Sequence, residues 1–278
     1  MKGETRYYDQ AVQQIKNITE PTLGVGVSNI FLPDSEVQFG LSARNLKRVD
    51  FALYPVNLTR DVRFTRDPDA EEGEGDNDNW IQKITTAGRV PARNWSKSLN
   101  DKGDYKPVNE QVRIEGKLPV GAYLLEAKSG ALSSRELVLV TDVAVVLKSS
   151  AKQALVYFSN ALTGAPIANA NVALWESYYT NSQWHWRKLR QTTNSDGLAA
   201  VRAQGHRRVS RNLFAVAECD GSTARLSPRA IPARTVRARP GAFTPSPIAP
   251  PIARRKRCSG NSSRAATAAV AMQRPRTR

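Results

Sequence analysis

Cysteine, histidine and methionine are scarce in this chain of 278 residues, which has two of each. Cys219 and Cys258 are too far apart in sequence to define a disulfide framework, and their spacing matches no zinc site. His185 and His206 are equally far from any metal-ligand pattern. The sequence therefore excludes a disulfide-rich scaffold, and we expect neither a metal site nor a cofactor.

Long apolar runs are also missing. No stretch is long enough to span a bilayer. The residues after Met1 form no apolar segment of the kind that a signal peptide needs. We therefore expect either an intracellular protein or an internal piece of a longer, exported chain, with membrane attachment only through an anchor outside this chain.

Acidic residues are absent from residues 221–278, although this stretch holds 13 of the 41 lysines and arginines. The other 28 basic residues face 25 acidic ones, so the formal net charge of +16 belongs mostly to this C-terminal stretch. It also has eight of the sixteen prolines, one aromatic residue and no hydrophobic periodicity. Such a composition cannot build a core. We predict a disordered basic tail at 225–278 and interpret it as sequence read in a shifted frame.

Helical spacing is confined to the N-terminal residues. Tyr7, Ala11, Ile15 and Ile18 recur at that spacing before Pro21, so residues 1–21 are predicted to be a short helical lead-in. The hydrophobic period then becomes two. The runs EVQFGLSAR at 36–44 and VDFALYPV at 49–56 alternate apolar and polar residues, and we interpret them as a hairpin joined at 45–47. Residues 60–80 have almost nothing to bury and are predicted to form a solvated loop.

Alternation returns at 111–118 and continues through a second set of strands. A hairpin turn is predicted at 149–152, and the Asp-Gly pair at 196–197 suits a turn with positive φ. About six strands in each of two groups, with short turns and no helices between them, favour antiparallel sheets. We predict an all-β fold of two tandem β-sandwich domains, at 22–141 and 142–224.

Several runs together resemble one protein family. They are GVSNIFLPDSEVQFGLSARNLKRVDFALYPVNL, LPVGAYLLEAKSG, LVLVTDVAVVLKSS, and ALVYFSNALTGAPIANANVALWE followed by TTNSDGLA. In this order and spacing they resemble the N-terminal macroglobulin-like domains of bacterial alpha-2-macroglobulin-like proteins. The resemblance covers roughly residues 22–220.

The resemblance implies seven-stranded macroglobulin domains in the periplasm or cell envelope and a role in trapping proteases. In that mechanism a bait segment is cut, the domains rearrange, and in many members a Cys–Gln thioester captures the protease. This chain has no Cys-Xaa-Glu-Gln motif, because Cys219 precedes Asp-Gly-Ser and Cys258 precedes Ser-Gly-Asn. We therefore expect a truncated fragment that is not an enzyme and has no catalytic residue. Its partners are expected to be further macroglobulin-like domains, with proteases as targets of the full-length protein.

An adhesion or binding module of the cell envelope is the main alternative. Tyr178, Tyr179, Trp184 and Trp186 could form an aromatic surface that binds a carbohydrate or a peptide. Tryptophans two residues apart on a strand more often cover a core or a neighbouring domain. These four residues are the only surface contacts that we predict.

Sharper site hypotheses have less support. The basic motif ARRKRC at 253–258 could bind nucleic acid, but it lacks a fold and interleaved aromatic residues, so no nucleic acid partner is expected. The acidic residues between 67 and 78 could gather around Ca²⁺, but Glu72 stands where an EF-hand loop needs glycine. Ser182, His185 and Asp196 lie near one another in sequence, without the local context of a catalytic triad.

Overall fold

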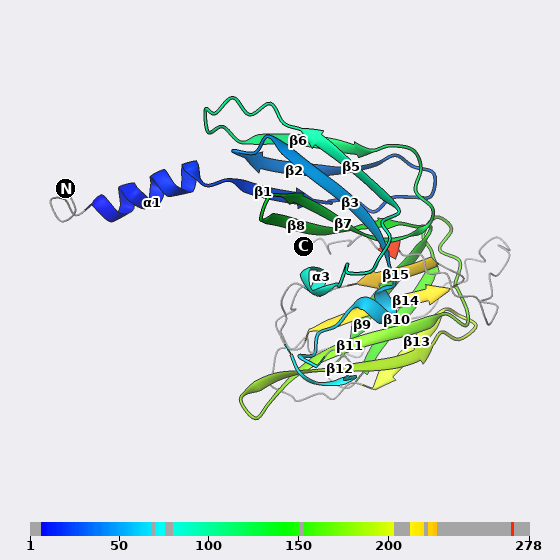
Figure 1. Cartoon of the computed structure of the whole chain (residues 1–278). Helices are drawn as coiled ribbons and strands as arrows, with labels where there is room; N and C mark the ends of the chain where they lie inside the picture. The colour runs from blue at the N-terminus through cyan, green and yellow to red at the C-terminus, as the bar shows by residue number, and fades with distance from the viewer. Residues whose placement is uncertain are drawn as a thin grey trace, which may run out of the picture. The chain divides into compact units, whose positions relative to one another are not determined.

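The computed structural model describes residues 7–67, 70–75, 80–150, 153–202, 212–219, 222–226 and 268–269. The chain divides into two compact units. The first comprises Met1–Val56, Ile81–Pro119 and Tyr123–Val138, and the second comprises Asn57–Trp80, Val120–Ala122 and Leu139–Arg278. Strands dominate both units, which confirms the predicted all-β sandwich class (Figure 1).

The first unit is built from two antiparallel sheets. One has the order β1-β2-β6 and the other the order β5-β3-β7-β8. Their bounds are β1 Thr22–Gly26, β2 Val37–Arg44, β3 Arg48–Val56, β5 Arg93–Ser98, β6 Val108–Ile114, β7 Gly121–Ser129 and β8 Leu132–Val140. As the sequence predicts, alternate residues of β2 and β3 are buried. Phe39 and Phe51 meet between the sheets with ring centroids 5.3 Å apart, and Phe51 stacks on Trp95 at 5.2 Å.

The hairpin expected at 45–47 is wrong. β2 and β3 lie in different sheets, so the chain crosses from one layer to the other at this point. Asn45 adopts a φ of 57° in this crossing. The alternation of apolar and polar residues could not reveal the error. A strand with one buried face has the same sequence pattern whether the next strand pairs with it in one sheet or packs against it from the other sheet.

The helix α1 spans Tyr8–Thr19, as the sequence predicts, and it has no buried residue. Its C-terminal end is fixed by side chains from the turn after β2. Asn45 Nδ2 donates to the carbonyl oxygens of Ile18 and Thr19, each at 2.9 Å. Such contacts satisfy the carbonyl groups that a helix end leaves unpaired. α1 is therefore held by its end and not by its apolar face.

The second unit is a larger sandwich, whose sheets have the orders β13-β10-β9 and β16-β15-β14-β11-β12-β4. Its strands are β4 Glu72–Glu74, β9 Val143–Ser149, β10 Gln153–Asn160, β11 Asn171–Thr180, β12 Gln183–Thr192, β13 Leu198–Arg202, β14 Leu213–Cys219, β15 Ser222–Leu226 and β16 Ala268–Ala269. The predicted hairpin at 149–152 is confirmed, since β9 and β10 pair antiparallel. Two short helices, α2 Leu58–Asp61 and α3 Trp80–Lys83, flank the segment that carries β4.

The core between these two sheets is mostly aliphatic, and it includes the fully buried Phe158. β11 contributes Val172 and Leu174 to it, so that the residues between them face the opposite side of the sheet. Gly197 turns the chain with a φ of 72°, and a Cβ there would lie 2.5 Å from the carbonyl oxygen of Phe158. The predicted Asp-Gly turn therefore fits only with glycine at this position.

Most of the basic tail lies outside the described residues. The prediction that this tail is disordered therefore concerns residues that the structure does not describe. Cys219 is buried at the end of β14 and is disulfide-bonded. Among the described residues, no helix is both long enough and apolar enough to cross a membrane.

Candidate functional site

The face of the larger sheet that points away from the aliphatic core is aromatic. Trp175 on β11, Trp186 on β12 and Phe214 on β14 lie on neighbouring strands, and each is at most 4% exposed. A sheet face of this kind must be covered, because exposed apolar surface of this extent is unfavourable in water.

The covering layer is the segment Asn57–Trp80, which the chain inserts between β3 and β5. Phe64 stacks on Trp186 with ring centroids 4.1 Å apart and 13° between the ring planes. Phe64 also meets Phe214 edge-on at 5.4 Å, and Trp80 meets Phe214 edge-on at 5.5 Å. We call Phe64, Trp80, Trp175, Trp186 and Phe214 the aromatic cluster.

Backbone hydrogen bonds fix the covering segment to the sheet. β4 pairs antiparallel with β12, with Gly73 opposite Trp186. On either side of this pairing, the Lys188 N–H donates to the carbonyl oxygen of Glu71 at 2.7 Å, and the Gly75 N–H donates to that of Trp184 at 3.1 Å. A Cβ on Gly75 would lie 1.9 Å from the carbonyl oxygen of Phe64, so only glycine fits.

The interpretation of residues 60–80 as a solvated loop is therefore wrong for the described part of that stretch. Val62, Phe64 and Trp80 are all buried, and Phe64 is 5% exposed. The few apolar residues are separated by a long acidic run, so no periodicity indicates burial. The residue types do indicate burial, because a phenylalanine and a tryptophan in one loop are seldom both exposed to water.

The four predicted contact residues do not form one surface. Trp186 is buried in the aromatic cluster. Trp184 is half-buried with its ring 5.3 Å from that of Tyr179, which is 42% exposed. Tyr178 points to the opposite face of β11, where its ring stacks on His185 at 5.5 Å.

Tyr178 also reaches the covering segment, because its hydroxyl donates a hydrogen bond to the Glu72 carboxylate. Burial, the hydrogen bond and the charge of Glu72 together raise the pKa of Tyr178 to about 12. The phenol is therefore neutral throughout the physiological range and acts as a donor that ties β11 to β4.

Within the described ranges, no group of three or more histidine, cysteine, aspartate or glutamate side chains could hold a metal ion. Asp69, Asp76 and Asp78 of the acidic run lie outside those ranges, as does His206. Ser182 is at the tip of the β11–β12 hairpin with a φ of 61°, while Asp196 lies in the turn after β12.

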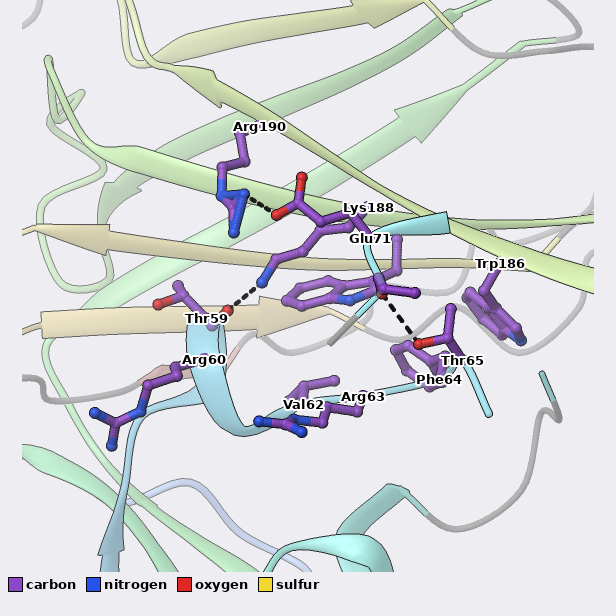
Figure 2. A pocket seen from close by; sticks show the side chains of 12 residues that line it. Thr59, Arg60, Val62, Arg63, Phe64, Thr65, Glu71, Trp186, Lys188 and Arg190 are labelled. Atoms are coloured by element: carbon purple, nitrogen blue, oxygen red, sulfur yellow. Dashed lines mark hydrogen bonds and ion pairs between the residues drawn. The ribbon is translucent and has the colours of Figure 1, made fainter. Parts of the chain in front are cut away.

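A cavity of about 310 Å³ opens beside the aromatic cluster, between the covering segment and the outer sheet face. Figure 2 shows the side chains that line it. Trp175, Trp186 and Phe64 give it apolar walls, and it is also lined by the charged residues Arg60, Arg63, Glu71, Lys188 and Arg190.

Lys188 is the half-buried cation of this cavity. Its Nζ donates to the carbonyl oxygen of Thr59 (Figure 2). The same Nζ lies 4.8 Å from the centre of the Trp175 ring. Burial lowers the pKa of Lys188, and the charges of Arg190 and Arg63 lower it further, while Glu71 opposes them. Glu71 forms an ion pair with Arg190. The cavity thus combines aromatic walls with charged residues, of which Arg190 is paired with Glu71 and Arg60 with Asp61.

No family model matches this chain, and no curated protein matches it. Among solved structures, native alpha-2-macroglobulin from Escherichia coli spanning domains MG0-NIE-MG1 is similar over 76% of this chain and 64% of that chain, at 16% identity and a TM-score of 0.47. The same protein spanning domains NIE-MG1 is similar over 75% of this chain and 98% of that chain, at 14% identity and a TM-score of 0.44.

A Salmonella alpha-2-macroglobulin variant is similar over 82% of this chain and 13% of that chain, at 12% identity and a TM-score of 0.44. This chain therefore spans less than two thirds of the first of these structures and a small part of the third. All three structures come from the bacterial family that the sequence runs of this chain resemble.

Proposed function

We propose that this chain is a structural part of a bacterial alpha-2-macroglobulin-like inhibitor that traps endopeptidases in the cell envelope. The sequence runs between residues 22 and 220 support the family, and the all-β architecture fits a module of such a protein. The bait segment and the reactive thioester would lie in further domains, which would be the partners of this chain. The chain itself is proposed not to be an enzyme.

The observation that carries a mechanical role is the covering segment. The segment Asn57–Trp80 leaves the strands of the first unit and adds β4 to a sheet of the second unit. The chain therefore does not follow a simple topology in which each domain is one continuous stretch. What it gains is a covered sheet face whose aromatic residues are buried and in contact with one another. That arrangement suits a module that keeps its shape while other parts of a protein rearrange.

The test compares this chain with the protein obtained by restoring the reading frame beyond codon 225. Each is incubated with trypsin, and cleavage of a large and of a small substrate is measured. The restored protein is expected to suppress cleavage of the large substrate only, whereas this chain suppresses neither. Strong protection by this chain alone, or a restored frame that encodes no further β-sandwich domain, would overturn the proposal.

A binding module of the cell envelope is a second candidate, which the exposed Tyr179 beside Trp184 favours. Aromatic rings at the end of a hairpin can stack on a sugar. Tryptophan fluorescence against a panel of glycans and peptides is the measurement. A saturable shift that Trp184→Ala abolishes would favour this function, and a flat response across the panel would exclude it for those ligands.

A further inference from the structure

The apolar side of α1 is exposed along the helix. Because they are spaced by four, three and four positions, four residues lie on one side of it, namely Tyr8, Val12, Ile15 and Thr19. Ile18 lies beside this line. No residue of α1 is buried, and Val12, Ile15 and Ile18 are 46%, 61% and 47% exposed. Since bare apolar surface is unfavourable in water, this side of α1 indicates a contact with a partner.

The attachment of α1 to the first unit leaves this side uncovered. Asn45 donates to the carbonyl oxygens of Ile18 and Thr19, and Arg44 donates to that of Asn17, so these bonds hold the last turn of the helix. α1 has 12 residues, a length at which an isolated helix is only marginally stable in water. Packing of an amphipathic side against a partner is the usual source of the missing stability.

The charges of α1 indicate what kind of partner fits. The helix carries one acidic residue, Asp9 in its first turn, and one basic residue, Lys16 in its last turn. Anionic lipid surfaces and nucleic acids attract helices with an excess of lysine and arginine, which α1 lacks. A helix with one charge of each sign, one near each end, is instead complementary to its own copy in the antiparallel orientation.

An antiparallel pair also matches the side chains. With Tyr8 opposite Thr19 of the second copy, Val12 lies opposite Ile15, and two-fold symmetry repeats both contacts. Asp9 and Lys16 each follow a residue of the apolar side by one position, so both lie along the same edge of it. In an antiparallel pair that edge meets itself, and Asp9 comes beside Lys16 of the second copy.

Lys16 already has one partner, since its Nζ lies 3.4 Å from the Glu20 carboxylate. Both side chains of this pair are 57% exposed, so it contributes little to stability. An ammonium group has three N–H donors, and Lys16 can therefore contact a carboxylate of a second copy as well as that of Glu20.

We propose that α1 pairs antiparallel with α1 of a second copy of this chain, through Val12 and Ile15 and with Asp9 beside Lys16. A helix of this length is about 18 Å long. The contact is therefore well below the roughly 1,200 Å² at which stable complexes begin, and the dimer forms and dissociates with concentration. Pairing through α1 does not depend on the proposed role in protease trapping.

The test is sedimentation equilibrium of the full chain from about 1 µM to about 1 mM, where a weak dimer dissociates. Salt at about 0.15 M screens the repulsion between two copies of net charge +16. The parent chain is expected to show a reversible monomer–dimer equilibrium. Ile15→Lys should stay monomeric throughout, because it places a charge in the middle of the contact. Val90→Lys is the matched control, since Val90 is 84% exposed in the same unit, and it should dimerise like the parent.

Charge reversal tests the orientation. Asp9→Lys and Lys16→Asp should each weaken the dimer about tenfold, because each creates two like-charge contacts by symmetry. An equal mixture of the two variants should dimerise about as well as the parent, since one helix then carries two lysines and the other two aspartates. If the substitutions acted only by weakening the helix itself, the loss would persist in the mixture. In a parallel pair each charge would lie level with its own copy, so neither single variant would weaken the contact.

A lipid surface is the other occupant that the experiment examines, through sedimentation with neutral phosphatidylcholine vesicles. A parent chain that stays monomeric to about 1 mM but sediments with vesicles, unless Ile15 is replaced by lysine, would assign the helix to lipid and overturn the proposal. An Ile15→Lys chain that dimerises like the parent would also overturn it. Unchanged dimers in both charge variants would rule out the antiparallel arrangement.

Discussion

Glu176 is the residue whose burial most needs a partner. Its side chain is 0% exposed, and Arg187 on the paired strand donates to its carboxylate at 2.6 and 2.9 Å. Removing Arg187 takes two charged hydrogen bonds from this buried carboxylate, whereas removing both members of a buried ion pair can be nearly neutral.

Arg187→Met is therefore expected to lower the free energy of unfolding by about 3–5 kcal/mol, measured by urea denaturation. The double variant Glu176→Leu/Arg187→Met should recover most of that loss. Arg48→Met is the control, because it breaks the exposed Arg48–Asp50 pair and should change stability by less than about 1 kcal/mol. Equal losses in Arg187→Met and Arg48→Met would contradict the role of burial.

Folding disfavours the charged form of the Glu218 carboxyl group. Burial raises its pKa, and the hydrogen bond that the Thr59 hydroxyl donates at 3.1 Å only partly opposes this. A carboxyl group whose pKa is raised by folding stabilises the protein below the pKa of the unfolded chain. That stabilisation disappears as pH rises through the folded pKa.

Glu218→Gln is accordingly expected to raise the melting temperature at pH 7.5 by about 2–4 °C, on the order of 1 kcal/mol. The amide oxygen can still accept from Thr59, while the charge is gone. Near pH 4 the carboxyl group of the parent chain is protonated, so the difference should shrink. Thermal melts at the two pH values give the answer, and a gain that is larger at pH 4 would contradict burial of the charge as its cause.

At the scale of one element, the packing of the covering segment on the sheet depends on Phe64. Phe64→Ala should cost about 3–5 kcal/mol, because it deletes the ring at the centre of the aromatic cluster. Tryptophan emission should shift to longer wavelength as Trp175 and Trp186 become hydrated. Tyr105→Ala, at a 49% exposed position, is the control and should leave both quantities nearly unchanged. A stable Phe64→Ala variant with unshifted emission would mean that the segment does not cover the sheet in solution.

Gly75 tests the close approach of two parts of the covering segment by backbone geometry alone. Gly75→Ala places a methyl group against the Phe64 carbonyl and must displace either Phe64 or the backbone at position 75, so we expect a loss of at least about 2 kcal/mol. Gly26→Ala is the matched control, since a Cβ at Gly26 meets nothing within 4 Å. Urea denaturation of the two variants side by side measures the difference, and similar midpoints would refute the close approach.

Sequence reasoning succeeded where one periodic pattern governs an element and failed where pairing is not local. The buried faces of β2 and β3 follow from alternation at Phe39 and Phe51, and α1 follows from helical spacing at Ala11 and Ile15. The crossing at 45–47 and the role of Phe64 could not be found in this way, because both depend on which strand lies opposite. The cavity combines residues more than a hundred positions apart, so no local pattern indicates it.

The second unit is discontinuous in the chain, and this shapes how the whole molecule can be divided. A cut at the connection between the two sets of strands would separate the aromatic face of β11, β12 and β14 from its cover. Residues 139–226 expressed alone should therefore bind the dye ANS more strongly and aggregate more readily than the full chain.

Fusing residues 57–80 to that piece through a flexible linker should reverse both effects, and the same fusion with Phe64→Ala should not. Dye fluorescence and light scattering of the three proteins decide the matter. A piece 139–226 that is as soluble and as inert to the dye as the full chain would show that the cover is dispensable.

The insertion of Asn57–Trp80 also imposes an order on synthesis. Phe64 leaves the ribosome about 120 residues before Trp186, and at ~5–20 residues per second that interval lasts roughly 6–24 s. During that time the covering segment has been synthesised, but the sheet face that it covers has not. We expect chaperones to bind the covering segment of the growing polypeptide during this interval. Slower translation should lengthen the interval and increase misfolding.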